Sequence, residues 1–140
     1  MTLDELAAAH DEVFAPWVKD LGLEPVEIGE DGCSFRLPES ARLTRAGGPG
    51  GGVVCGQAVS AAADTAAVMT ILAVNGKTRP FTTIDLAAHF LRPLPEGEVE
   101  VVVTLLSNGK RMASARAEFR AAGGGKLAAT VTCAFAYLDL

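Results

Sequence analysis

The stretch Gly51–Asn75, GGVVCGQAVSAAADTAAVMTILAVN, decides the fold of this chain. It starts with glycines and continues as a long run of mostly small apolar residues with one carboxylate, Asp64, in the middle. As a helix it is apolar on nearly every face, and such a helix is buried in a protein core or in a bilayer. A mid-helix aspartate costs about 2.5–3.5 kcal/mol on membrane insertion. Because Gln57, Ser60 and two threonines also interrupt the run, we expect a central helix over about residues 54–75, wrapped by a sheet, and no membrane span.

Composition narrows the class of protein. At 140 residues we expect one domain, residues 1–140. The net charge is −5 and the twelve Lys and Arg are scattered, so nucleic acid is a poor partner. The three cysteines lie far apart and the chain has only two histidines, so no metal site is expected. Free thiols and an acidic N-terminus without the pattern of a secretory signal predict a cytoplasmic protein.

Residues 2–21 are predicted to form an N-terminal helix. Thr2 and Glu5 have the spacing of a capping box, and Pro16 should kink the helix or begin a second turn there. A stripe recurs at three- and four-residue intervals: Leu3, Leu6, His10, Val13, Trp17 and Leu21. Since His10 falls on this stripe, we expect it to have a structural role.

The other segments favour a sheet. Residues 24–28 and 33–37 alternate apolar and polar and predict a hairpin, and 38–52 reads as a loop. After the central helix, strands are predicted over 80–91, 98–106, 111–121 and 126–138. Ile84, Leu86 and Phe90 would share one face of the first of these strands, with His89 on the other. The order predicts an α+β domain with one curved antiparallel sheet around a helix.

Two segments resemble a known family. Residues 55–66, CGQAVSAAADTA, are similar to a His-Gly-Gly motif followed by a helix with ALADTA-like residues. Residues 83–97, TIDLAAHFLRPLPEG, are similar to the strand that follows in the same proteins. In order and at this separation, they resemble the hotdog fold, and within it the PaaI-like (phenylacetate-degradation-type) acyl-CoA thioesterases. The resemblance implies a sheet wrapped around one long central helix.

The resemblance also implies catalytic residues. Gly56 matches the glycine whose N–H polarises the thioester, and the start of a helix suits that role because its amides are unpaired and its dipole end is positive. Asp64 matches the acidic residue, as general base or nucleophile. Thr83 matches a strand hydroxyl that orients water or the carboxylate. From the residues alone, Asp64 could instead be a buried carboxylate bonded to Thr65, Ser60 or a strand, and Thr83 could be a structural strand residue.

The sequence also suggests which residues contact the substrate. Cys55, Gln57, Arg92 and Val68 are the expected substrate-binding residues. Coenzyme A enters as part of the substrate, with no other cofactor, and its phosphates would need cations, for which the candidates are Arg92, Lys110, Arg111 and Lys77. The acyl chain would lie against Val68, Met69, Leu72 and Phe90. In the family the site is shared across a homodimer interface, and a tetramer is the alternative assembly.

The chain departs from the family pattern around the helix start. Cys55 stands where the family usually has His, Gln57 replaces the second Gly, and Pro49 falls where a polar Asn or Gln is common. A thiol at a helix N-terminus could be a nucleophile, but a small packed residue explains Cys55 as well. These departures favour one alternative, a non-catalytic acyl-CoA-binding hotdog protein. A hotdog hydratase is less favoured, because it relies on a His at the helix start.

Overall fold

The computed structural model describes residues 1–48 and 51–139. Short helices and a hairpin come first, a long helix follows, and four long strands complete the chain. The elements are α1 Leu3–Val13, α2 Pro16–Lys19, β1 Glu24–Ile28, β2 Gly32–Leu37, η1 Ala41–Leu43, β3 Thr44–Gly48, β4 Gly51–Val54, α3 Gly56–Asn75, η2 Gly76–Thr78, β5 Phe81–Phe90, β6 Val99–Asn108, β7 Met112–Ala121 and β8 Leu127–Tyr137.

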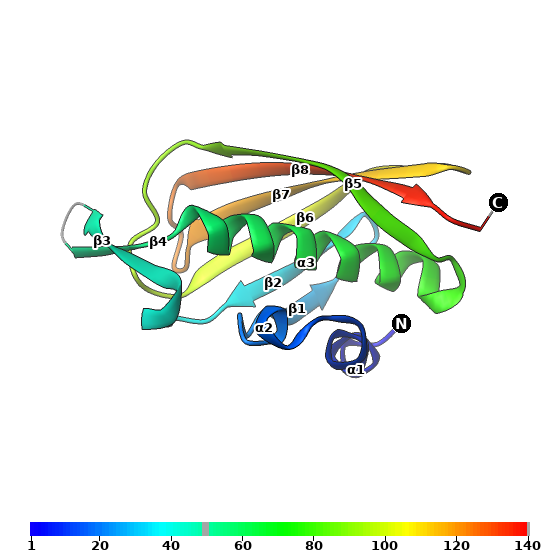
Figure 1. Ribbon diagram of the computed structural model, residues 1–140, viewed down its shortest axis with the longest axis horizontal. Helices are drawn as coiled ribbons and strands as arrows, with labels where there is room; N and C mark the ends of the chain where they lie inside the picture. Colours follow the sequence, from blue (N-terminus) through cyan, green and yellow to red (C-terminus); the bar gives the residue numbers. More distant parts are fainter. Residues whose placement is uncertain (49–50, 140) are drawn as a thin grey trace.

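Six strands form one antiparallel sheet in the order β1-β2-β6-β7-β8-β5. The sheet curves around α3, and α1 and α2 lie beside β1 (Figure 1). This arrangement confirms the expected hotdog architecture. The strand β5 is at one edge of the sheet, and among the described residues its only strand partner is β8.

The helix α3 is the core element. Its alanines pack closely on the sheet, and Ala62, Ala63, Ala66 and Ala67 are fully buried. Larger side chains from the strands fill the space around them, including Phe35, Val101, Phe119, Val131 and Phe135. Of the helices in the described residues, α3 alone is long and apolar enough to span a membrane, but most of its apolar window is buried in the fold. Its hydropathy is therefore that of a core helix.

The N-terminal segment differs from the prediction of one helix over 2–21. The capping box is present, with the Glu5 amide donating to the Thr2 hydroxyl at 3.1 Å and the Thr2 amide donating to the Glu5 carboxylate at 3.0 Å. However, α1 ends at Val13, and Pro16 begins α2 after two extended residues. The predicted stripe is only partly confirmed, because Leu6, His10 and Leu21 are buried whereas Leu3, Val13 and Trp17 are exposed.

The loop predicted over 38–52 is wrong. Residues 44–48 and 51–54 form β3 and β4, a separate two-stranded sheet, after the short helix η1. The five glycines in this segment concealed it, because glycine is depleted in strands. β4 runs to Val54, so α3 begins at Gly56 rather than at 54. Pro49 lies outside the described residues.

A β-bulge changes the faces of β5. Thr83 pairs with Phe135 and Asp85 with Ala134, which leaves Ile84 as the extra residue. The expectation that Ile84 faces the helix with Leu86 is therefore wrong, since Ile84 is 52% exposed. The bulge turns Thr83 toward α3.

Candidate active site

Asp64 has a partner on the neighbouring strand. The Thr83 hydroxyl donates a 2.8 Å hydrogen bond to Asp64 Oδ1, in a half-buried position. Thr65, which the sequence also offered as a partner, is engaged elsewhere, because its hydroxyl donates to the Ala61 carbonyl at 2.7 Å. The carboxylate is thus held by β5 and still reaches the surface of this chain.

Burial and the charge of Asp64 both affect the pKa of Cys133 on β8. Burial raises the pKa of its thiol to about 12, and the negative charges of Asp64 and Asp85 add to that rise. The thiol is therefore uncharged at neutral pH and is no nucleophile. Burial also raises the pKa of Cys33.

Within the described part of the chain, the first amides of α3 have no hydrogen-bond acceptor. Cys55 is the N-cap, and its side chain makes no capping hydrogen bond. The helix ladder starts with the Val59 amide, which donates to the Cys55 carbonyl at 3.2 Å. The amides of Gly56, Gln57 and Ala58 therefore lack an intrahelical acceptor. The Phe90 ring lies against Gly56, where an added Cβ would be 3.3 Å from the ring.

Two pockets flank β5 at its opposite ends, and they share no lining residue. The first, which we name the Gly56 pocket, has a volume of about 470 Å³ and is lined by Arg45, Val53, Val54, Gly56, Val59, Phe90, Leu91, Arg92, Pro93, Leu94 and Ala129. The second, the Thr83 groove, has a volume of about 420 Å³ and is lined by Val13, Phe14, Val68, Leu72, Lys77, Arg79, Pro80, Phe81, Thr82 and Thr83.

A single chain does not bring Gly56 and Asp64 to the same point. They are eight residues apart on one helix, so the rise of about 1.5 Å per residue separates them by about 12 Å along its axis. A carbonyl oxygen bonded to the Gly56 amide is therefore out of reach of the Asp64 carboxylate of the same chain.

The predicted substrate-binding residues divide among three places. Val68 lines the Thr83 groove and Arg92 lines the Gly56 pocket, where Arg92 Nε donates to the Leu127 carbonyl at 3.0 Å. Cys55 and Gln57 line a smaller pocket of about 260 Å³ on the side of α2.

The predicted slot of Val68, Met69, Leu72 and Phe90 is not one site. Val68 and Leu72 line the Thr83 groove, but Phe90 lines the Gly56 pocket. Met69 is fully buried in the core and lines neither.

The predicted phosphate cations also separate. Lys77 lines the Thr83 groove, while Lys110 and Arg111 line neither pocket. Arg45, which lies on β3, lines the Gly56 pocket together with Arg92. Sequence reasoning missed Arg45 because its segment was predicted to be a loop. Neither His10, which is buried, nor the exposed His89 lines either of these two pockets.

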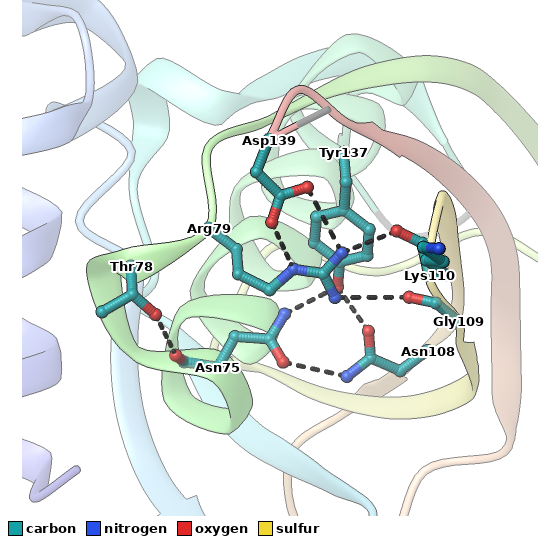
Figure 2. Close-up of polar contacts among 8 residues, drawn as sticks. All are labelled: Asn75, Thr78, Arg79, Asn108, Gly109, Lys110, Tyr137 and Asp139. Atoms are coloured by element: carbon teal, nitrogen blue, oxygen red, sulfur yellow. Dashed lines mark hydrogen bonds and ion pairs between the residues drawn. The ribbon is translucent and has the colours of Figure 1, made fainter.

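A polar cluster fixes the far end of α3 (Figure 2). The Arg79 guanidinium lies 3.5 Å above the Tyr137 ring, and its Nε bonds Asp139 at 2.8 Å. Its other nitrogens donate to the carbonyls of Gly109, at 3.3 Å, and Lys110, at 2.7 Å. Below it, the Tyr137 hydroxyl bonds the side chains of Asn75 and Asn108, whose amides also bond each other. This cluster joins α3, the β6–β7 turn and the end of β8.

A curved antiparallel sheet around one long central helix is the hotdog fold. Residues 40–136 match the family model described as "Acyl-CoA thioesterase N-terminal domain", and the chain belongs to this family. The PaaI-like resemblance is thus supported at the level of the family. No curated protein matches the chain.

Solved structures share this fold. The conserved protein PA5202 from Pseudomonas aeruginosa is 28% identical, with a TM-score of 0.79 over 93% of this chain and 99% of that one. The thioesterase HI1161 from Haemophilus influenzae is 22% identical, with a TM-score of 0.84 over 100% and 92%. The phenylacetic acid degradation protein PaaI from Thermus thermophilus is 22% identical, with a TM-score of 0.73 over 89% and 100%.

Proposed function

We propose that this protein hydrolyses acyl-CoA thioesters to the free acid and coenzyme A, in a cytoplasmic homodimer whose two sites each use Gly56 from one copy and Asp64 from the other. The observation that carries the proposal is the pair of Asp64 and Thr83, which holds a carboxylate at the surface of a core helix whose start carries free amides. The separation of about 12 Å between the two groups is the reason for a shared site.

The edge strand β5 supplies the means of assembly. An edge strand offers unpaired backbone groups, and a second β5 running antiparallel to it would continue the sheet. Exposed apolar side chains follow this edge, namely Ile84, Phe90 and Leu91. A two-fold axis near the middle of β5 would place the Phe90 end of one copy beside the Phe81 end of the other. The Gly56 pocket of one copy would then face the Thr83 groove of its partner, and a tetramer of two such dimers is the larger alternative.

In the proposed hydrolysis, the Asp64 carboxylate and the Gly56 amide have separate roles. Asp64 takes a proton from water as the water oxygen attacks the acyl carbon, and negative charge develops on the thioester oxygen beside the Gly56 amide. The carbon–sulfur bond then breaks, and the coenzyme A thiolate takes up a proton. Direct attack by Asp64, with later hydrolysis of the anhydride, is the other route. Arg92 and Arg45 at the Gly56 pocket suit the coenzyme A phosphates, and Val68 suits the acyl chain.

A thiol-release assay over short, medium, long and aryl acyl-CoAs tests the proposal. Asp64→Asn should lower kcat by about 10²–10⁴-fold while the circular dichroism spectrum stays unchanged. Asp31→Asn is the matched control, because Asp31 is an exposed aspartate in the turn between β1 and β2, at the opposite edge of the sheet from β5, and should retain activity. Full activity of Asp64→Asn would exclude this mechanism.

One observation favours the second candidate, a non-catalytic acyl-CoA-binding protein. Cys55 replaces the family's usual His, and it lines the pocket beside α2 instead of either pocket at β5. Thermal stabilisation by acyl-CoA, with no thiol released from any member of the panel, would establish binding without catalysis.

A further inference from the structure

The Thr83 groove begins at the proposed catalytic carboxylate. Thr83, which bonds Asp64, is one of its lining residues, and the groove runs past Val68 and Leu72 of α3. From Asp64 to Leu72 the helix rises by about 12 Å. The volume of about 420 Å³ exceeds the roughly 150 Å³ of an engineered cavity that binds benzene. The groove therefore has room for a medium-length aliphatic or aryl-alkyl chain.

The far end of this groove offers no free partner for a charged acyl group. Arg79 is part of the lining, but its guanidinium is engaged by Asp139, two backbone carbonyls and the Tyr137 ring (Figure 2). Lys77 is paired with Glu12 at 2.6 Å. Because the remaining lining is mainly apolar, the end of the groove suits an uncharged tail.

The end of α1 closes the far end of the groove, because Glu12 of α1 pairs there with Lys77. Val13 and Phe14 line it, and Phe14 packs on the buried His10 with ring centroids 5.3 Å apart. The Glu12–Lys77 ion pair joins this end of α1 to η2, and both of its side chains are at least half exposed. An ion pair this exposed contributes little to holding the end of α1 in place. The position of this segment therefore depends chiefly on the packing of Phe14.

We propose that the end of α1, residues 12–14, is the end wall of the acyl site and sets the upper limit on the length of the uncharged acyl chain. This inference rests on the proposed function, because it takes Asp64 as the point where the thioester lies. Chains that fit between Asp64 and Phe14 are accepted, and each added methylene strengthens binding until the groove is full. Longer chains must displace α1.

The test uses two readouts on the full-length chain. Binding of alkyl-CoA thioethers with two to sixteen carbons, which are not hydrolysed, is measured by calorimetry, and thiol release is measured with acyl-CoAs of the same lengths. In the wild type, affinity should rise about fourfold per methylene and then reach a plateau. Phe14→Ala should move the plateau to longer chains. Val68→Phe should lower affinity and kcat/KM at least about tenfold for medium chains and spare the shortest ones.

Val74→Phe is the matched control, since it is the same substitution on α3 at an exposed residue outside the groove lining. It should leave both length profiles unchanged. Length profiles that are identical in the wild type, Phe14→Ala and Val68→Phe would overturn the inference even if the enzyme is active. Absence of thiol release together with the expected thioether profile would overturn the proposed hydrolysis and leave the end wall supported.

Discussion

The Thr83 hydroxyl donates a 2.8 Å hydrogen bond to the Asp64 carboxylate, across the contact between β5 and α3. This bond exists because the bulge at Ile84 lets Thr83 face the helix while the rest of β5 keeps its pairing with β8. A carboxylate held by one hydroxyl has restricted rotation and keeps its second oxygen free for water. In the proposed mechanism, Thr83 is therefore a positioning residue for the base.

Replacing that hydroxyl should affect turnover more than binding. Thr83→Val keeps the shape of the side chain and removes the donor, so kcat should fall about tenfold or more while KM changes little, because hydrogen bonds to charged groups contribute roughly 1.5–3 kcal/mol. Thr83→Ser should recover most of the loss. Steady-state thiol release provides the measurement. Equal kcat values for Val and Ser at this position would show that the hydrogen bond plays no part in turnover.

The Gly56 amide can be removed without losing the helix. Gly56 is the first residue of α3, where proline is favoured, and Cys55 before it has φ −70° and ψ 152°, which proline tolerates in its predecessor. Gly56→Pro should lower kcat about 10²–10³-fold, as the loss of one oxyanion donor does elsewhere. Circular dichroism and thermal unfolding should show an intact fold.

Gly56→Ala is the control for the steric effect of this change. It places a Cβ at the same 3.3 Å from the Phe90 ring but keeps the N–H. Its activity should therefore stay well above that of Gly56→Pro. If the two variants lose activity equally, crowding against Phe90 and not the missing donor is the cause.

Most of the fold could be predicted from periodicity. The two-residue alternation from Val99 to Val103 and from Ala129 to Phe135 places these side chains in the core, where they are buried. Asp64 stood out because a charge within an apolar helix needs a partner. The identity of that partner depended on the resemblance, since nothing in the alternation of residues 80–91 indicates a bulge at Ile84.

Other features could not be predicted because they depend on contacts between distant segments. Arg45 lines the Gly56 pocket only because the glycine-rich strands β3 and β4 pair with each other. Trp17 fits the spacing of the α1 stripe, but the two extended residues before Pro16 change the direction of the chain, and the Trp17 side chain is exposed to solvent. Phe90 matches the strand pattern and yet covers Gly56, because that glycine leaves room for a ring.

The cluster around Tyr137 should contribute measurably to stability. Tyr137→Phe keeps the ring beneath Arg79 and removes the hydroxyl that bonds Asn75 and Asn108. Asn75 is half-buried and Asn108 is exposed, so losing these hydrogen bonds should cost about 0.5–1.5 kcal/mol and lower the midpoint of thermal unfolding by roughly 2–5 °C. Differential scanning calorimetry gives the value, and an unchanged midpoint would mean that water replaces the hydroxyl at no cost.

The same cluster should give stability a dependence on acid pH. The hydrogen bond from Arg79 holds the pKa of Asp139 below its ordinary value of 3.8. Because the folded-state pKa is lowered, the stabilisation is fully present above the ordinary value and is lost as the pH falls through the folded-state value. Asp139→Asn should therefore unfold at a lower temperature than the wild type at pH 7, and the difference should shrink below about pH 4. A difference that is constant across this range would exclude ionisation of Asp139 as its source.

Mixing two inactive variants tests whether the site is shared between copies. Gly56→Pro removes the donor and leaves Asp64 intact, while Asp64→Asn does the reverse. In a mixed dimer with shared sites, one site receives both defects, and the other combines the intact Gly56 of one chain with the intact Asp64 of its partner. Unfolding and refolding an equimolar mixture should therefore restore up to about a quarter of the wild-type sites, because half of the dimers are mixed and each has one complete site. If each site were built within one chain, every site would carry a defect and the mixture would stay as inactive as the separate variants. That result would also contradict the argument for a dimer that rests on the spacing of about 12 Å between Gly56 and Asp64 along α3.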